Sequence, residues 1–206
     1  MKLEVLKTDG SKTGRTVEIS DEIFGIEPHE HVMWLAVKQY LANQRQGTHS
    51  SKEKSDVSGS TRKLIKQKGT GGARKGSIKA GLLRGGARVF GPKPRDYSFK
   101  VNAKEKELAR RSALSQKAKE NQIFVIEDMN LPTHRTKEAF ALLKNLGMTA
   151  RKTLVVVNDS TDNLKRATRN IAGITLTTAG GLNTYEVLKA TNLLFAEGTI
   201  KAMGSK

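Results

Sequence analysis

The glycine-rich stretch at residues 71–77, GGARKGS, contains the residue types that hold phosphate groups in nucleotide-binding enzymes. A Walker loop needs a glycine, four further residues and then Gly-Lys followed by Ser or Thr, so that the lysine reaches the phosphates. Gly71 and Gly76 have this separation, but Ser77 stands where the lysine is required. A dinucleotide fingerprint fails as well, because Arg74 occupies the position of its third glycine. The pattern therefore disfavours nucleotide binding by this loop.

Three carboxylates suggest a second chemistry, Mg²⁺-dependent catalysis. Glu127 and Asp128 end one predicted buried strand, and Asp159 ends another. Open α/β sheets bind ligands at the carboxyl ends of their strands, and Mg²⁺ prefers oxygen ligands. Acidic residues also commonly leave buried strands as turn and cap residues, and no nucleophile or base motif accompanies these three. We favour the turn interpretation; a magnesium enzyme would require Asp128 and Asp159 to share a site.

The four histidines do not form a metal-binding pattern. His29 and His31 are two residues apart and diverge on a helix, while His49 and His134 are isolated. The chain has no cysteine, which excludes a disulfide framework and a thiolate zinc site. We therefore expect neither a metal nor a cofactor, and we interpret the histidines as solvated or capping residues.

The apolar pattern predicts an α/β fold in three layers, a mostly parallel sheet flanked by helices. The chain opens with two short strands around the turn at Asp9 and Gly10, followed by a helix at about 29–43. After Pro94 the pattern alternates between the two types of element. Strands are expected at 122–128, 153–159, 173–179 and 192–198, and helices at 103–119, 135–147, 161–170 and 183–191, with a short helical tail at the end.

Local signals predict how some of these helices begin and what they bury. Asn102 with Glu105 three residues later matches a capping box. Met33 and Trp34 on the first long helix are interpreted as core or partly buried packing residues rather than as a ligand site. A solvated helix face is the interpretation of Arg110, Arg111, Lys117 and Lys119, with contact to phosphate as the alternative.

Positive charge is the strongest signal of composition. The 206 residues carry 37 Lys and Arg against 20 Asp and Glu, a net charge of +17. Residues 45–100 hold 15 basic and 3 acidic residues, net +12, whereas residues 1–44 have a net charge of −2. A surplus of this size points to a polyanionic partner. No run of 18 apolar residues and no secretory pattern is present, so we expect a cytoplasmic protein without a membrane partner.

The basic segment has no regular period and few large apolar groups. Ten of the 19 glycines lie between Arg45 and Gly91, and no aromatic residue occurs between Tyr40 and Phe90. We predict one globular domain from residues 1–44 and 92–206, with residues 45–91 as an extended loop inserted in it. The candidate RNA-binding cations are Arg45, Lys52, Lys54, Arg62, Lys63, Lys66, Lys68, Arg74, Lys75, Lys79, Arg84, Arg88, Lys93, Arg95 and Lys100.

Closely spaced cations suit a phosphate backbone, and glycines allow the main chain to approach it. The lack of aromatic residues argues against a stacking platform for single strands and favours a segment that threads through a folded RNA. The alternative is a disordered linker or localisation tail, which explains the charge but not the return of the chain to the same domain.

The order of short motifs in this segment resembles that of large-subunit ribosomal protein four, a universal family that lines part of the nascent-peptide exit tunnel. The matching motifs are RQGT at 45–48, VSGS at 57–60, QKGTG at 67–71, ARKGS at 73–77 and GPKPRDYSFKVN at 91–102. The resemblance covers essentially the whole chain, and the length looks bacterial. Two positions depart from it: Ile65 replaces a common aromatic residue, and Gly72 replaces a common arginine.

The resemblance implies a globular domain on the solvent side of the large ribosomal subunit and a loop buried in rRNA. The loop tip would reach the tunnel constriction near the macrolide site, opposite a loop of large-subunit protein twenty-two. The matching tip residues are Gln67, Lys68, Gly69, Thr70 and Gly71, with Arg74 just behind. We therefore expect a non-enzymatic structural protein of the subunit, which helps its assembly and forms no homo-oligomer. A free RNA-binding regulator is the alternative.

Overall fold

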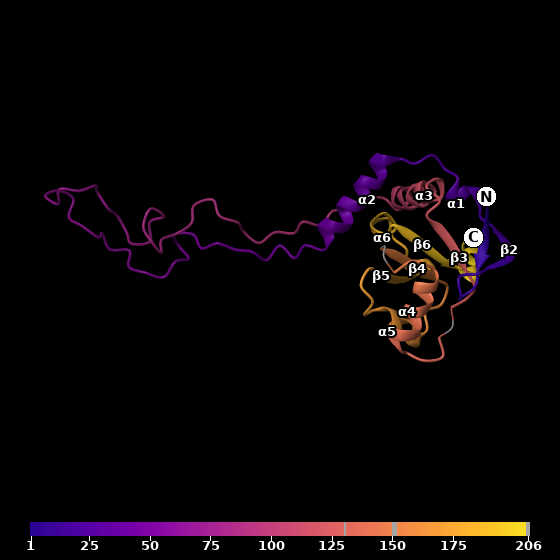
Figure 1. The fold of residues 1–206 in the computed structure, drawn as a ribbon. Coiled ribbons are helices and arrows are strands. Elements are labelled where there is room, and N and C mark those ends of the chain that lie inside the picture. Colours follow the sequence, from indigo (N-terminus) through magenta and orange to yellow (C-terminus); the bar gives the residue numbers. More distant parts are fainter. Residues whose placement is uncertain (130, 150–151, 205–206) are drawn as a thin grey trace. The chain divides into compact units, whose positions relative to one another are not determined.

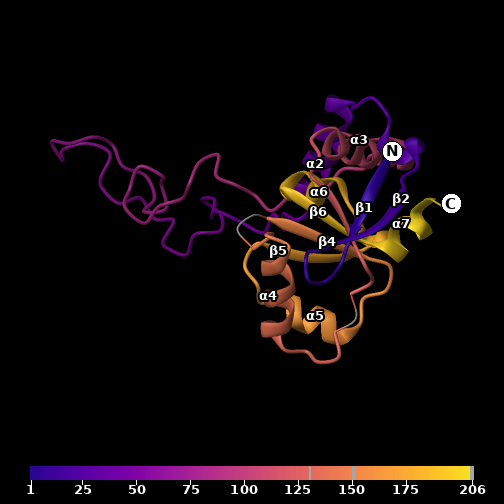
Figure 2. The ribbon, with the colours of Figure 1, turned by 45° about the vertical axis from the view of Figure 1, so that its right-hand side comes forward.

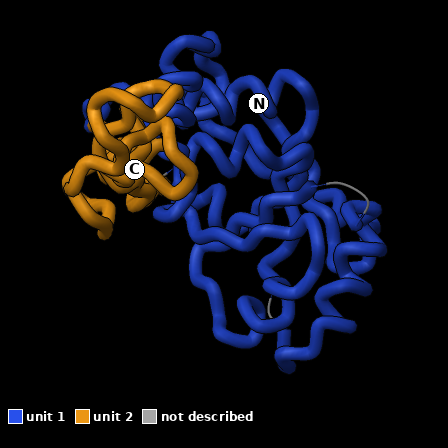
Figure 3. The backbone as a smooth tube through the Cα atoms, turned by 90° about the vertical axis from the view of Figure 1, so that its left-hand side faces the viewer, with its two compact units in different colours: residues 1–41, 100–206 blue, residues 42–99 orange. Residues whose placement is uncertain are grey.

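The chain divides into two units, which Figure 3 shows in different colours. The computed structural model describes residues 1–129, 131–149 and 152–204. The sheet unit comprises residues 1–41 and 100–206, and the loop unit comprises residues 42–99. The sequence places the corresponding boundaries of the loop at 45 and 91.

The sheet unit is built on six strands in the order β2-β1-β3-β6-β4-β5 (Figure 1). β1 and β2 form an antiparallel pair, and every other neighbouring pair is parallel. This confirms the predicted α/β class and mostly parallel sheet. The strands are β1 Lys2–Leu6, β2 Lys12–Glu18, β3 Ile123–Ile126, β4 Thr153–Val157, β5 Ile174–Thr178 and β6 Asn192–Ala196.

Helices lie against the sheet, with α3 and α6 on one side and α4 and α5 on the other (Figure 2). The four-residue α1 is too short for a periodic signal, and the sequence does not predict it. Within the described residues the helices are α1 Asp21–Phe24, α2 Glu30–Asn43, α3 Ala103–Lys119, α4 Thr136–Asn145, α5 Asp162–Thr168, α6 Thr184–Lys189 and α7 Glu197–Gly204, with a 3₁₀ turn at Ala179–Gly181.

Strand β4 shows why an apolar run becomes a central strand here. All five of its residues are buried, and successive side chains point to opposite faces of the sheet. Leu154 and Val156 join the cluster that contains Leu114 of α3, while Val155 and Val157 join the cluster that contains Leu143 of α4. A strand covered on both faces favours apolar side chains, which explains the run from Leu154 to Val157. The first residue, Thr153, is polar, and its buried hydroxyl donates a hydrogen bond of 3.2 Å to the carbonyl of Met148.

Three local predictions about the helices are wrong. Asn102 is the N-cap of α3, but its side chain makes no cap hydrogen bond, so the capping box does not form. Trp34 is 55% exposed, whereas its neighbour Met33 is buried as predicted. Lys117 is buried, and its ammonium donates a hydrogen bond of 2.6 Å to the side-chain oxygen of Gln122. No helix of the described residues is long and apolar enough to cross a membrane.

Candidate nucleic-acid interface

The loop unit contains no helix or strand beyond Asn43, and the next element begins at Ala103. Its outgoing limb, residues 45–64, and its returning limb, residues 76–97, run side by side and are connected by a turn at 65–75 (Figure 1). Backbone hydrogen bonds join the limbs, from Arg95 N to Gly47 O at 3.1 Å, Ser51 N to Pro92 O at 2.9 Å, Arg88 N to Lys52 O at 3.1 Å and Leu64 N to Gly76 O at 3.0 Å. These few hydrogen bonds hold the two limbs together, while most side chains of the limbs remain exposed to solvent.

The two limbs meet around the ring of Tyr97. The guanidinium carbon of Arg45 lies 3.7 Å from the ring centroid, and that of Arg95 lies 4.5 Å from it. The tyrosine hydroxyl is 3.2 Å from Nε2 of His49. Gly47 is required beside this cluster because its φ is +64° and a Cβ there would overlap the Arg95 carbonyl oxygen. The backbone therefore brings two guanidinium groups to one aromatic ring.

Neither guanidinium group has an anionic partner in the part of the chain that the structure describes. The nearby carboxylate of Asp96 instead accepts hydrogen bonds from the Ser98 backbone at 2.8 Å and from its hydroxyl at 2.7 Å. These bonds lower the pKa of Asp96 from its ordinary value. Two cations over one ring repel each other unless an anion binds them, and guanidinium N–H groups match phosphate oxygens.

The remaining cations of the loop unit are also without acidic partners, with one exception. Lys93 forms an ion pair of 2.6 Å with Glu53, and this hydrogen bond raises the pKa of Lys93. Of the 15 cations predicted to bind RNA, the other 14 form no ion pair with any described residue. Lys79 is half-buried and the rest are exposed. Lys100 belongs to the sheet unit, and the other 14 lie in the loop unit. The structure thus brings most of the predicted cations together on two neighbouring limbs.

The predicted tip residues lie in the turn, where all five are exposed: Gln67, Lys68, Gly69, Thr70 and Gly71. The two glycines have φ values of +83° and +63°, with open space where a Cβ would stand. Their backbone conformation, rather than crowding, therefore calls for glycine. The Gln67 side-chain oxygen accepts a hydrogen bond from the Lys63 ammonium, which ties the turn to the outgoing limb.

The GGARKGS stretch does not have the surroundings of a nucleotide-binding loop. No strand precedes it and no helix follows it within the loop unit. The Ser77 hydroxyl, which a phosphate loop would present to a ligand, donates a hydrogen bond of 2.9 Å to the carbonyl of Ser60. This hydrogen bond joins the two limbs.

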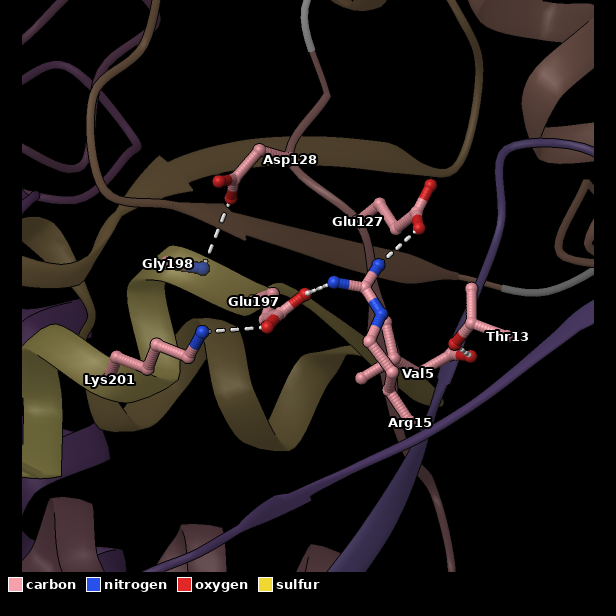
Figure 4. Close-up of polar contacts among 8 residues, drawn as sticks. All are labelled: Val5, Thr13, Arg15, Glu127, Asp128, Glu197, Gly198 and Lys201. Atoms are coloured by element: carbon pink, nitrogen blue, oxygen red, sulfur yellow. Dashed lines mark hydrogen bonds and ion pairs between the residues drawn. The ribbon is translucent and has the colours of Figure 1, made fainter.

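The three carboxylates considered for magnesium binding are engaged elsewhere, and Figure 4 shows two of them, Glu127 and Asp128. Glu127 pairs with Arg15, and Asp128 accepts a hydrogen bond of 3.1 Å from the backbone N–H of Gly198. Asp159 accepts one of 3.0 Å from the side chain of Asn158. Among the described residues, no group of three or more His, Cys, Asp or Glu side chains could hold a metal ion. The turn interpretation agrees with this geometry, and the shared magnesium site does not.

Sequence reasoning missed Glu197, which completes the same polar network. Its carboxylate is 2.7 Å from the ammonium of Lys201 and 3.6 Å from the guanidinium of Arg15. The hydrogen bond from Lys201 lowers the pKa of Glu197, and burial opposes that shift. The sequence places Glu197 in the predicted strand 192–198, whereas helix α7 begins at this residue. The spacing of Glu197 and Lys201, four residues apart, becomes an ion-pair signal only on that helix.

The histidines are distributed over separate contacts. His29 offers its backbone N–H to the hydroxyl of Ser112 at 3.3 Å, and the ring of His31 stacks on Trp34 with centroids 5.8 Å apart. His49 contacts Tyr97 in the loop unit. His134 is exposed.

Comparison with known proteins agrees with the motif order. The model of the Ribosomal protein L4/L1 family matches residues 17–206. The chain belongs to this family. It is 54% identical over 200 residues to the large ribosomal subunit protein uL4 of Parabacteroides distasonis, with 97% of this chain and 96% of the relative covered. It is 48% identical over 206 residues to that of Christiangramia forsetii, covering 100% and 99%. The uL4 of Porphyromonas gingivalis is 52% identical over 200 residues, covering 97% and 96%.

These matches confirm the predicted resemblance over its whole expected extent. The family is one of structural proteins of the ribosome rather than of enzymes. Both enzyme interpretations of the sequence are therefore set aside, the nucleotide loop as well as the magnesium site.

Proposed function

We propose that this protein is a structural constituent of the large ribosomal subunit and binds rRNA through its loop unit. The cations of the two limbs carry the proposal, because nearly all of them are exposed and without acidic partners in the described chain. Phosphates of folded RNA would supply the missing anions, and the glycines would let RNA approach the backbone. The names of the relatives support the subunit assignment, and with it a place in the cytoplasm.

A salt titration with large-subunit rRNA tests the phosphate contacts. Each phosphate contact contributes a slope of about −0.7 to −0.9 in log K against log salt. The triple variant Lys52→Gln, Arg62→Gln, Arg84→Gln, which removes three exposed cations of the limbs, is expected to make this slope about two units shallower. The matched control is Lys7→Gln, Lys137→Gln, Lys144→Gln, which removes three exposed cations of the sheet unit. Equal slopes for the two triple variants would contradict binding through the loop unit.

We propose further that the turn lines the nascent-peptide tunnel opposite large-subunit protein twenty-two and assists subunit assembly. The order of the motifs at 67–71 and 73–77 supports this assignment. Lys68→Glu is expected to alter macrolide susceptibility while the variant still enters large subunits, as sucrose-gradient sedimentation would measure. Normal susceptibility of subunits that contain the variant would contradict a position at the tunnel.

A further inference from the structure

The returning limb carries a bulge at residues 89–91. Arg88 donates its backbone N–H to the carbonyl of Lys52, and the carbonyl of Pro92 accepts the N–H of Ser51. Ser51 and Lys52 are consecutive, whereas three residues separate Arg88 from Pro92. The three extra residues have no counterparts on the outgoing limb, and bulges of this kind redirect side chains.

The bulge depends on two backbone features, at Phe90 and Gly91. Phe90 has a φ of +53°, and the only other non-glycine described residue with a positive φ is Asn121. A bulky residue rarely adopts this left-handed conformation, and such residues cluster at functional sites. At Gly91 a Cβ would overlap the hydroxyl oxygen of Ser51, so the limbs close beneath the bulge only with glycine there.

The bulge exposes apolar surface in a cationic setting. Phe90 is completely exposed, and Val89 is 69% exposed. Phe90 lines a hollow of about 590 Å³ together with the cations Lys54, Arg88 and Lys93. Glu53 also lines this hollow, and its carboxylate is paired with Lys93. Two of these three cations, Lys54 and Arg88, lack an acidic partner in the described chain. A strained backbone therefore holds an aromatic ring in water beside unpaired positive charges.

We propose that Phe90 is a stacking site for one unpaired RNA base, with the neighbouring cations binding the phosphates beside that base. Aromatic rings stack on splayed bases in single-stranded or looped RNA, whereas a base within a duplex has no free face. An apolar protein partner would have to bury Lys54 and Arg88 without counter-charges, which is unfavourable. The proposal rests on the proposed function and assigns a base contact that cation spacing does not reveal.

The test uses the full chain and two probes of equal phosphate number, a single-stranded oligoadenylate and a blunt-ended RNA duplex. Phe90→Asn removes the ring and keeps a residue that tolerates positive φ, so the bulge is retained. Phe90→Trp keeps an aromatic face. Leu82→Asn is the matched control, because Leu82 is another completely exposed apolar residue of the loop unit. Fluorescence anisotropy gives the affinities, and circular dichroism melts check the fold.

Phe90→Asn is expected to weaken binding of the oligoadenylate by roughly 5- to 100-fold, since stacking contributes that much per base. Its affinity for the duplex and its salt slope stay at the parent values, as do those of Phe90→Trp and Leu82→Asn with either probe. The stacking proposal is overturned if Phe90→Asn binds oligoadenylate as tightly as the parent, or if it loses the same factor with the duplex. If the parent binds neither probe in a salt-dependent manner, the proposed rRNA binding fails as well.

Discussion

The sheet unit pairs charges and buries apolar side chains within itself, whereas the loop unit leaves most of its charges unpaired and most of its side chains exposed. In the sheet unit, two apolar clusters cover both faces of the sheet, and Arg15 lies between Glu127 and Glu197. In the loop unit, Ala87 is the one buried hydrophobic residue, and most cations have no acidic partner in the described chain. One unit therefore contains the interactions that stabilise it, whereas the other has charges and surfaces that only a partner can satisfy.

Removing most of the loop unit should have the largest effect on RNA binding. Replacing residues 50–88 with a short Gly-Ser linker should abolish salt-dependent RNA binding, because it removes most of the unpaired cations. The sheet unit should keep its cooperative melt, since little apolar surface is lost. Circular dichroism and filter binding measure the two effects. A variant that no longer melts cooperatively would show that the sheet unit depends on the loop.

The converse experiment damages the sheet unit alone. Phe195 is fully buried in β6, and its ring meets that of Phe24 edge to face with centroids 6.1 Å apart. Phe195→Ala should lower the free energy of unfolding by about 3–5 kcal/mol, as urea denaturation measures, because it leaves a cavity in a packed core. Leu82→Ala, at a completely exposed residue of the loop unit, should change it by less than about 0.5 kcal/mol. Similar losses for both variants would contradict the contrast in burial.

A smaller effect is expected from substitutions of Tyr97 in the loop unit. Tyr97→Leu removes the ring over which Arg45 and Arg95 lie, and should weaken RNA binding by roughly 2- to 5-fold, the size of an exposed cation–π contact. Tyr97→Phe keeps the ring and loses only the hydrogen bond between the hydroxyl and His49, so its affinity should stay near the parent value. Melting temperatures of both variants should equal that of the parent. An equal loss for Phe and Leu would assign the effect to the hydroxyl rather than to the ring.

The sequence predicted the parts of the molecule that local patterns determine. Continuous apolar runs are typical of buried parallel strands, and spaced cations with glycine indicate a partner of opposite charge. Contacts between residues that lie far apart in the sequence could not be predicted from such local patterns. The bulge at Phe90 depends on which residues of the outgoing limb pair with Arg88 and Pro92, and Arg15 meets Glu197 only after the sheet has formed.

Trp34 was mispredicted for a related reason. Helix α2 has apolar residues around most of its circumference, so its periodicity does not tell which face the sheet unit covers. Met33 lies on the covered side and Trp34 does not, although both are large and apolar. Burial of a residue on such a helix follows from its tertiary neighbours.

The smallest predicted effect concerns the internal charge pairing of the sheet unit. Glu197 is held by Lys201 and Arg15, and its pKa in the folded state is lowered. A lowered pKa stabilises the fold above the unfolded-state pKa of about 4.3, and this contribution disappears as pH falls through the folded-state pKa. Glu197→Gln should therefore cost up to about 1 kcal/mol at neutral pH, the upper range for ion pairs with exposed partners, and the cost should shrink under acidic conditions.

Urea denaturation of parent and variant at neutral pH and near pH 3 measures this difference. Glu22→Gln is the control, because Glu22 is exposed and has no ion pair among the described residues. A cost of Glu197→Gln that persists unchanged in acid would mean that the side chain contributes through hydrogen bonds of its neutral form rather than through its charge. In that case the stability of the sheet unit would not depend on the paired charge of Glu197, and its contrast with the loop unit would rest on burial and on the other ion pairs, such as that of Arg15 with Glu127.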